Sequence, residues 1–294
     1  MSGPHSISLR DGATTADADE NTAARPRPVL LTGASGLLGQ WLVRTAPPGR
    51  QVIALTHRHS IAGLAEVHAD LRDAGSTMTA VKRADPSLVI HAAYAKDRAA
   101  IVDATAHVVA ATREVDADVV VISTDAVFCG DGIARAEGSE PDPVWSYGRW
   151  KAEAERIALV QSATAAIIRL PLLVSFDPDD HVVREIRTRA AQGETTQWFT
   201  DETRQPALAH EVAAAVWRIA DLTTNVRGGT WQLAGCERLT RYEIALRVVD
   251  QLGLRRDVIE AVTTPKGAVR PRDIAFADAR ARAEVDWHPS PVLR

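Results

Sequence analysis

The chain has 294 residues, of which 46% are hydrophobic, and a formal net charge of -4 from 34 basic and 38 acidic residues. This length and composition suit one large α/β domain or two unequal lobes. The charges are scattered without a basic footprint for nucleic acid, and no run approaches the ~20 apolar residues of a membrane span.

The two cysteines, Cys129 and Cys236, lack CxxC spacing and a neighbouring histidine cluster. Neither a disulfide framework nor a metal site is therefore expected, and we predict a cytoplasmic protein that binds no metal. Residues 1–28 are polar, carry several prolines and lack the apolar region of a signal peptide, which predicts a disordered tail.

Short apolar runs alternate with helical segments from Val29 onward, the pattern of a parallel sheet with helices on both faces. The run 119–122 is typical of a strand buried on both faces. We predict strands over 29–32, 51–56, 66–69, 88–91, 119–123, 165–170 and 230–234. Helices are predicted over 38–45, 99–115, 147–159, 182–191, 210–222 and 241–252, the last with Thr240 as its N-cap.

This order predicts an α/β fold, a Rossmann-type doubly wound parallel sheet with a smaller C-terminal substrate lobe. We assign residues 29–170 to the dinucleotide-binding domain, with 207–235 returning to it. The strict alternation loosens after Leu170, and residues 171–206 and 236–294 are therefore assigned to the smaller lobe.

Residues 32–39 read TGASGLLG, a G-x-x-G-x-x-G loop between the first strand and the first helix. Such glycines make a tight turn, let the backbone approach a pyrophosphate and allow close packing of the helix, whose N-terminus attracts the phosphates. A glycine triplet alone can be turn chemistry, but its position after the first strand favours a cofactor site. The predicted contacts are Gly33, Ser35, Gly36, Leu37, Leu38 and Gly39.

The turn after the second strand, residues 56–60, lacks the acidic residue that usually contacts the ribose of NAD. Arg58, aided by His57 or Ser60, is instead suited to the 2'-phosphate of NADP, so we predict NADP(H) in preference to NAD(H). An exposed turn arginine without a ligand is the alternative.

Further cofactor contacts are predicted where the third and fourth strands end. Asp70 and Leu71 are placed to meet the adenine. After the fourth strand, small residues let the backbone pass close to the cofactor in the segment of Ala92, Ala93 and Tyr94. His91 is interpreted as a packed strand-end histidine rather than a catalytic one.

Tyr147 and Lys151 are four residues apart in a predicted helix and so share one face. The ammonium would favour the phenolate, lowering the pKa of a phenol from its usual ~10 and making Tyr147 a proton donor to a carbonyl. Thr124, at the end of the fifth strand, is predicted to orient that carbonyl, with a strand-end cap as the alternative role. Together with the glycine loop, these residues favour hydride transfer.

Three segments resemble the extended short-chain dehydrogenase/reductase superfamily: 32–39, 123–125 (STD) and 147–151 (YGRWK). Within it the chain is similar to the dTDP-4-dehydrorhamnose reductase group, whose Ser-Thr-Asp-x-Val-Phe segment is matched by residues 123–128. Further matches are 168–170, 200–206 and 234–243.

The resemblance implies reduction of the 4-keto group of a nucleotide-linked deoxysugar, with hydride from the nicotinamide and a proton from Tyr147. Lys151 would hold the nicotinamide ribose and bias the phenol, while Thr124 would share the carbonyl oxygen. The substrate is then a small molecule, and a homodimer is expected only because symmetric oligomers are common.

The expected substrate pocket departs from the group's pattern at three positions. Ala126, beside Asp125, stands where an aromatic residue is common, Leu172 where the reductases carry a tryptophan, and Trp150 where a serine or threonine usually precedes the lysine. Trp145 and Trp198 are candidate platforms for a base or sugar, with core packing as the alternative.

Arg204 has two open interpretations, a contact to a substrate phosphate or a tie within its loop to Asp201 or Glu202. Two other functions also stay open for the whole chain. One is an epimerase or dehydratase with tightly held NAD, and the other is a noncatalytic dinucleotide-binding protein, as in the regulatory subunit of methionine adenosyltransferase.

Overall fold

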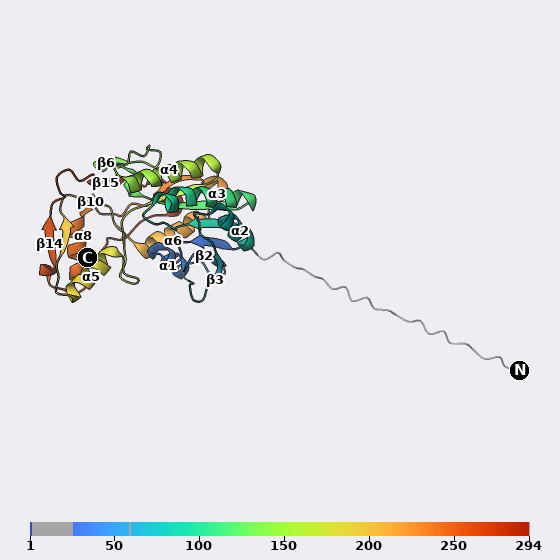
Figure 1. Ribbon diagram of the computed structural model, residues 1–294, viewed down its shortest axis with the longest axis horizontal. Coiled ribbons are helices and arrows are strands. Elements are labelled where there is room, and N and C mark those ends of the chain that lie inside the picture. The colour runs from blue at the N-terminus through green and yellow to red at the C-terminus, as the bar shows by residue number, and fades with distance from the viewer. Residues whose placement is uncertain (2–25, 59, 294) are drawn as a thin grey trace.

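The computed structural model describes Met1 and residues 26–58 and 60–293, and its largest sheet has seven parallel strands in the order β12-β7-β5-β4-β1-β2-β3 (Figure 1). The strands are β1 (Val29–Thr32), β2 (Val52–Thr56), β3 (Ala65–His68), β4 (Leu88–His91), β5 (Asp118–Thr124), β7 (Ala166–Leu170) and β12 (Gly229–Gln232). The strand order reverses between β1 and β4. Ligands of such sheets bind beyond the carboxyl ends of the strands at this reversal.

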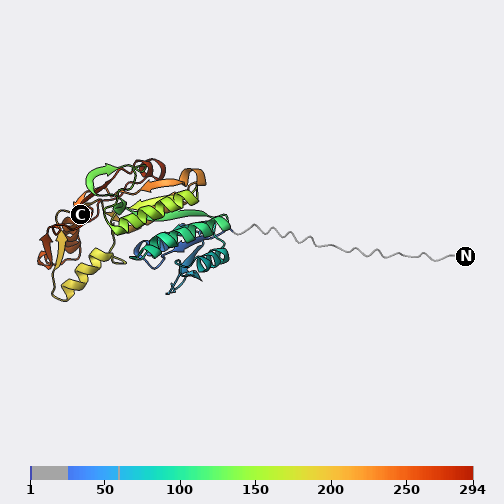
Figure 2. The same cartoon turned by 45° about the horizontal axis from the view of Figure 1, so that its top comes forward.

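Helices cover both faces of this sheet. Two of them, α1 and α6, pack on one face, while α2, α3 and α4 pack on the other, where α3 and α4 lie side by side (Figures 1 and 2). Their bounds are α1 (Leu37–Arg44), α2 (Ala74–Ala84), α3 (Ala104–Glu114), α4 (Ser146–Gln161) and α6 (Ala209–Ala220). The predicted doubly wound α/β fold is confirmed.

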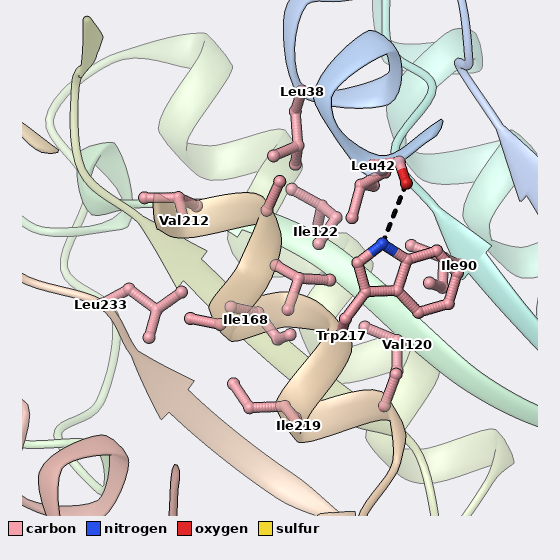
Figure 3. Packing of buried hydrophobic residues seen from close by; sticks show 14 of the residues in the cluster. Leu38, Leu42, Ile90, Val120, Ile122, Ile168, Val212, Trp217, Ile219 and Leu233 are labelled. Carbon is pink, nitrogen blue, oxygen red and sulfur yellow. Dashed lines mark hydrogen bonds between the residues drawn. The ribbon is translucent and has the colours of Figure 1, made fainter. Parts of the chain in front are cut away.

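The core divides between the two faces because successive strand residues point to opposite sides. In β1, Leu31 packs with α1 and α6, whereas Leu30 packs with α2 and α3. Figure 3 shows the first of these clusters, in which the indole nitrogen of Trp217 donates to the Leu42 carbonyl at 2.9 Å. This contact joins α6 to α1, the helix that follows the glycine loop.

A smaller group of elements lies at the end of the molecule away from α2 and β3 (Figures 1 and 2). It contains a mixed sheet in the order β13-β10-β15-β6 and the strand pair β14-β9, with helices α5 and α8 packed on that pair. The remaining strands are β6 (Asp131–Arg135), β8 (Leu173–Val174), β9 (Thr196–Phe199), β10 (Thr203–Arg204), β11 (Ala207–Leu208), β13 (Leu239–Thr240), β14 (Ile259–Val262) and β15 (Asp273–Phe276). The remaining helices are η1 (Ala99–Asp103), η2 (Asp125–Val127), α5 (His181–Ala191), α7 (Thr224–Arg227), α8 (Arg241–Gln251), η3 (Arg256–Val258) and α9 (Ala279–Val285).

The predicted elements are found with small shifts of their ends. Two regions differ from the prediction. Helix α2 is absent from the prediction, and its buried positions are mostly small residues, Thr77, Ala80, Val81 and Ala84. Asp73 starts it by accepting a hydrogen bond from the Ser76 amide at 2.6 Å. The predicted helix 99–115 begins instead with the π-helical turn η1 before α3. Thr240 is confirmed as the N-cap of α8, where it forms a capping box with Glu243.

The division into two lobes stays a prediction, although β12 does join the large sheet beside β7. The predicted tail over residues 1–28 falls mostly on 2–25, outside the described residues. Within the part of the chain that is described, no helix is long and apolar enough to cross a membrane.

Candidate active site

The glycine loop joins β1 to α1 in a geometry that only glycine tolerates. Gly33 has a φ of +73°, and a Cβ there would lie 2.6 Å from the Ala93 nitrogen. A Cβ on Gly39 would lie 2.1 Å from the Gly33 carbonyl oxygen. The first glycine therefore allows the turn and the approach of the Ala92–Ala93 backbone, while the third allows the helix to pack on the loop.

The start of α1 leaves backbone donors available for an anion. Gly36 is the N-cap, and no side chain of the described residues caps the first turn. Ser35 and Gly36 are exposed, whereas Leu38 is buried in the core, so Leu38 can offer a ligand only its backbone. An uncapped helix start behind a glycine loop fits the pyrophosphate of a dinucleotide cofactor.

The predicted ribose and adenine contacts gather beyond β2 and β3. His57, Arg58 and Ser60 are exposed in the turn after β2, and His57 approaches Asp70, with its Nε2 3.8 Å from Oδ2. Asp70 accepts from Arg72 at 2.9 and 2.7 Å, and this pairing holds the pKa of the carboxyl well below its usual range. The Asp70 carboxylate is thus already engaged by a residue that the sequence reasoning did not include.

A second residue missed from the sequence is Glu66 of β3, which accepts a hydrogen bond from the Ile61 amide in the same turn. That bond, with a contribution from Ser60, lowers the pKa of the Glu66 carboxyl. The parallel pairing of β2 with β3 brings this carboxylate to a turn that has none of its own. A search for acidic residues on the neighbouring strand would have found it.

The segment after β4 is fixed by a buried hydrogen-bond relay. His91 is 3% exposed, and its Nδ1 lies 2.8 Å from Oγ1 of Thr32, which accepts from the Ala93 amide at 3.1 Å. Burial, with help from the charge of Lys151, lowers the pKa of His91 to about 3, so the ring is neutral. These contacts agree with the packed interpretation of His91, whose ring orients Ala93 toward the glycine loop.

Thr124 and Tyr147 meet where β5 ends and α4 begins. The Thr124 hydroxyl donates to Asp125 at 3.1 Å and accepts from the Ala126 amide at 3.2 Å, so it also serves as the cap of η2. The Tyr147 ring lies between Tyr94 and Trp145, with ring centroids 6.1 and 5.7 Å away. The Thr124 hydroxyl also acts on the pKa of the Tyr147 phenol, lowering it, so the structure brings the predicted hydroxyl and phenol together.

Lys151 is 9% exposed, and its Nζ donates to the Ile122 carbonyl at 2.9 Å. Its ammonium also lies 6.0 Å from the centroid of the Tyr94 ring, which is exposed. Burial lowers the pKa of Lys151 to about 8, against an opposing contribution from Glu155. The side chain is a buried amine rather than an ordinary solvated lysine.

The expected effect of Lys151 on the phenol is not found. Burial raises the pKa of Tyr147, with Tyr94 adding to the rise and the Thr124 hydroxyl opposing it. Lys151 shares the helix face as predicted, but its ammonium is bound to a backbone carbonyl of β5. In this structure the phenol thus holds its proton firmly.

The predicted substrate residues on η2 and just before β8 have different surroundings. Ala126 is buried beneath α4, where a Cβ on Gly148 would lie 2.1 Å from its carbonyl oxygen. Leu172 packs against the apolar cluster that includes Val174. Burial raises the pKa of Asp125, although the charges of nearby arginines oppose this.

The two candidate tryptophan platforms also differ. Trp198 is 5% exposed, donates to Thr196 at 2.7 Å and belongs to the core of α5 and α8, which favours packing. Trp145 is half-buried at the N-cap of α4, and its indole nitrogen has no hydrogen-bond partner among the described residues. Trp145 is therefore the better placed of the two for a ligand.

Arg204 mainly ties β10 to the segment that precedes β15. It donates to the carbonyl oxygens of Pro271 at 2.9 Å and Arg272 at 3.1 Å, and its Nη2 lies 3.6 Å from Glu202. These contacts favour the loop interpretation over a phosphate contact. The ion-pair partner is Glu202 rather than Asp201, which pairs with Arg272 instead.

Arg204 is nevertheless one member of an arginine cluster, defined here as Arg204, Arg241 and Arg270. Burial and the other two arginines lower the pKa of Arg241 to about 10, and Glu202 opposes this. The guanidinium of Arg270 lies 5.7 Å from the Trp145 ring centroid, so the cluster adjoins the start of α4. The sequence reasoning missed Arg241 and Arg270 as site residues because they come from segments far apart in the chain.

The fold and this site define a class of protein. A doubly wound parallel sheet, a glycine loop at the start of α1, and a threonine, tyrosine and lysine at β5 and α4 are the arrangement of an extended short-chain dehydrogenase/reductase, a class of NAD(P)-dependent oxidoreductases. Residues 27–291 match the family described as RmlD substrate binding domain, and the chain belongs to that family.

Its curated relatives are distant and differ in function. The probable low-salt glycan biosynthesis reductase Agl14 of Haloferax volcanii is 28% identical over 265 residues, covering 83% of this chain and 87% of that protein. The dTDP-4-dehydrorhamnose reductase of Mycobacterium tuberculosis is 27% identical over 280 residues, covering 90% and 88%. The methionine adenosyltransferase 2 subunit beta of Bos taurus is 24% identical over 277 residues, covering 84% and 79%.

Solved structures agree with the fold. The hypothetical dTDP-4-dehydrorhamnose reductase of Sulfolobus tokodaii has a TM-score of 0.75 at 28% identity, covering 87% of this chain and 93% of that one. MoeE5 in complex with UDP-glucuronic acid and NAD has a TM-score of 0.77 at 23% identity, covering 90% and 94%. The second likeness shows the fold alone.

Proposed function

We propose that this protein is an NADPH-dependent reductase of a keto group, namely the 4-keto group of a nucleotide-linked, dTDP-type deoxysugar. One observation carries the proposal: an unbroken line of contacts runs from the glycine loop to the phenol. Gly33 abuts Ala93, and the ring of the adjoining Tyr94 faces that of Tyr147. A cofactor on the loop and a carbonyl at Tyr147 would thus share one site.

The residues at the end of β5 and the start of α4 supply the acid half of the reduction. When bound, the reduced nicotinamide cofactor supplies the hydride for the carbonyl carbon. Tyr147 gives its proton to the carbonyl oxygen, which becomes the new hydroxyl. The raised pKa of Tyr147 keeps the phenol protonated at neutral pH, as a donor must be, and the Thr124 hydroxyl orients the same oxygen.

Lys151 has the role of a cation at this site. Its pKa of about 8 leaves the ammonium mostly protonated at pH 7. A protonated lysine would hold the ribose hydroxyls of the cofactor by hydrogen bonds. The bond to the Ile122 carbonyl uses one of its three donors, so two remain.

The arginine cluster supports a substrate that carries negative charge. Three guanidinium groups gather here, and the carboxylates of Glu202, Asp125 and Asp180 lie near them. Such a group suits a diphosphate, the anion that a nucleotide-linked sugar brings. Trp145 adjoins the cluster and offers its unpartnered indole nitrogen to a polar ligand atom.

Exposed arginines support the preference for NADPH. Arg58 is exposed in the turn after β2, and Arg72 is exposed beside Asp70. Glu66 accepts a hydrogen bond from the Ile61 amide in the same turn through one oxygen of its carboxylate. Cytoplasmic location and a homodimer are further parts of the proposal and stem from the sequence alone.

One alternative has a specific observation in its favour. The similarity to methionine adenosyltransferase 2 subunit beta covers 84% of the chain, so a noncatalytic dinucleotide-binding role competes with catalysis. The presence of Thr124, Tyr147 and Lys151 at one site favours the reductase.

The test is oxidation of NADPH by the purified protein with a panel of nucleotide-linked 4-keto sugars. Turnover with one or more of them, and its loss in Tyr147→Phe, supports the proposal. Tight NADPH binding with no turnover across the panel supports the noncatalytic alternative. A protein that is purified with oxidised NAD bound points to an epimerase or dehydratase instead.

A further inference from the structure

Lys151 belongs to a buried polar network that extends one turn further along α4. Glu155 follows Lys151 at the i+4 spacing and, like Arg169 of β7, is only 3% exposed. Arg169 donates to the Glu155 carboxylate at 2.8 Å from Nη2 and at 3.1 and 3.2 Å from Nε. The Ser123 hydroxyl donates to the same carboxylate.

These contacts attach α4 to the end of β5 at two successive turns. Lys151 binds the Ile122 carbonyl, and Glu155 accepts from the side chain of Ser123, the next residue. Thr124 follows directly in the strand. The buried network thus holds the backbone at the end of β5. That backbone carries the Thr124 hydroxyl and the Ile122 carbonyl to which Lys151 is bound.

Charge gives Glu155 a second effect. The carboxylate balances the guanidinium of Arg169, which would otherwise be an unpaired cation buried in the same core as the ammonium. Two buried like charges disfavour each other's ionised forms, whereas a carboxylate near an ammonium favours it. The network as it stands adds no net positive charge next to Lys151.

Other groups around Lys151 do not replace this effect. On β4 the neutral His91 faces it, and the loop that follows contributes the Tyr94 ring. Asp125 of η2 is engaged by Thr124. The π-helical turn η1 also packs on α4, and its Asp103 pairs with the exposed Arg98. On α3, the His107 ring contacts the Leu71 carbonyl.

We propose that Glu155 is a positioning residue for Lys151: its carboxylate, held by Arg169 and Ser123, cancels the charge of Arg169 and keeps the buried ammonium protonated. The consequence for catalysis rests on the proposed function, because only there does Lys151 hold the cofactor ribose. The protonation of Lys151 can be measured without any substrate.

The chain offers a direct measurement because it has only four lysines, Lys82, Lys96, Lys151 and Lys266. In protein labelled with 13C-lysine, each gives its own side-chain NMR signal, and the signal missing from Lys151→Met identifies Lys151. Titration of this signal with pH in the full chain gives its midpoint. The other three lysines are exposed, so far-UV circular dichroism is used to show whether each variant is folded.

Glu155→Gln keeps the size of the side chain but replaces one accepting oxygen with an NH2 donor, so part of the bonding to Arg169 and Ser123 is lost and Arg169 is left unbalanced. We expect the Lys151 midpoint to fall by about one pH unit or more, a tenfold loss of protonation. Arg169→Met removes the opposite charge and should raise the midpoint. The double variant should return it toward the wild-type value, since both charges are then absent.

Glu153→Gln is the matched control, because Glu153 lies on the same helix but pairs with Arg98 at the surface, and its effect should be slight. A folded Glu155→Gln protein with an unchanged midpoint would overturn the proposal. A fall of the Lys151 midpoint in Arg169→Met would also overturn it. This variant decides the question if Glu155→Gln fails to fold.

The result separates this inference from the proposed function. A shifted Lys151 midpoint in a protein that reduces no keto sugar would refute the reductase while leaving the role of Glu155 intact. If the protein is a reductase, NADPH affinity in Glu155→Gln should fall between pH 7 and 8 relative to Glu153→Gln. An unshifted midpoint in an active reductase refutes only the role of Glu155.

Discussion

Lys151→Met should make the protein more stable while impairing the site, because burial of the ammonium costs folding free energy. The pKa of Lys151 falls from 10.5 to about 8 in the folded chain. This fall of about 2.5 corresponds to roughly 3 kcal/mol of unfavourable free energy near pH 7. Loss of the bond to the Ile122 carbonyl offsets about 1 kcal/mol of the gain. We therefore expect the free energy of unfolding to rise by about 1–3 kcal/mol.

The pH dependence gives the sharper test. Because the folded pKa is depressed, the unfolded wild-type chain holds more protons than the folded one between pH 8 and 10.5, so its stability rises with pH across that window. The advantage of Lys151→Met is complete below pH 8 and disappears as the pH approaches 10.5. Urea unfolding of both proteins from pH 7 to 10.5 measures this difference.

Lys82→Met is the control, since Lys82 is exposed on α2 and its replacement should change the stability by less than about 0.5 kcal/mol. A Lys151→Met protein that is less stable than wild type at pH 7 would refute the reasoning. A gain in the stability of Lys151→Met that stays constant between pH 8 and 10 would refute it too. The gain would then not come from the titration of Lys151.

Three further predictions concern the cofactor and the chemistry. Tyr147→Phe should keep NADPH binding and lose about 10²- to 10⁴-fold in turnover, because the ring stays and the acidic proton is lost; unchanged turnover would remove Tyr147 from the mechanism. Arg58→Ala should raise the KM for NADPH far more than that for NADH, and equal effects on both would refute a contact to the 2'-phosphate. Gly39→Ala should weaken NADPH binding and destabilise the fold, because its Cβ would lie 2.1 Å from the Gly33 carbonyl oxygen; a protein with wild-type affinity and melting temperature would contradict the packing role of Gly39.

Local patterns were enough to predict the large sheet and the residues at its carboxyl edge. Alternating apolar runs define strands buried on both faces, and the glycine loop falls between β1 and α1 as its spacing predicts. Residues that close a turn or cap a helix act over a few positions, which is why Gly33 and Thr240 were assigned correctly. Helix α2 was missed because its buried face, Thr77, Ala80, Val81 and Ala84, carries only one large apolar side chain.

Tertiary structure decided the electrostatics of the site. The sequence places Lys151 four residues after Tyr147, but only the packing of α4 on β5 turns its ammonium to the Ile122 carbonyl and buries it. The Glu155–Arg169 pair joins two successive elements and the arginine cluster joins three separate segments, and no local spacing records either of them. Burial and charge depend on every element around a group, so the pKa values of Tyr147 and Lys151 follow from the fold rather than from the motif.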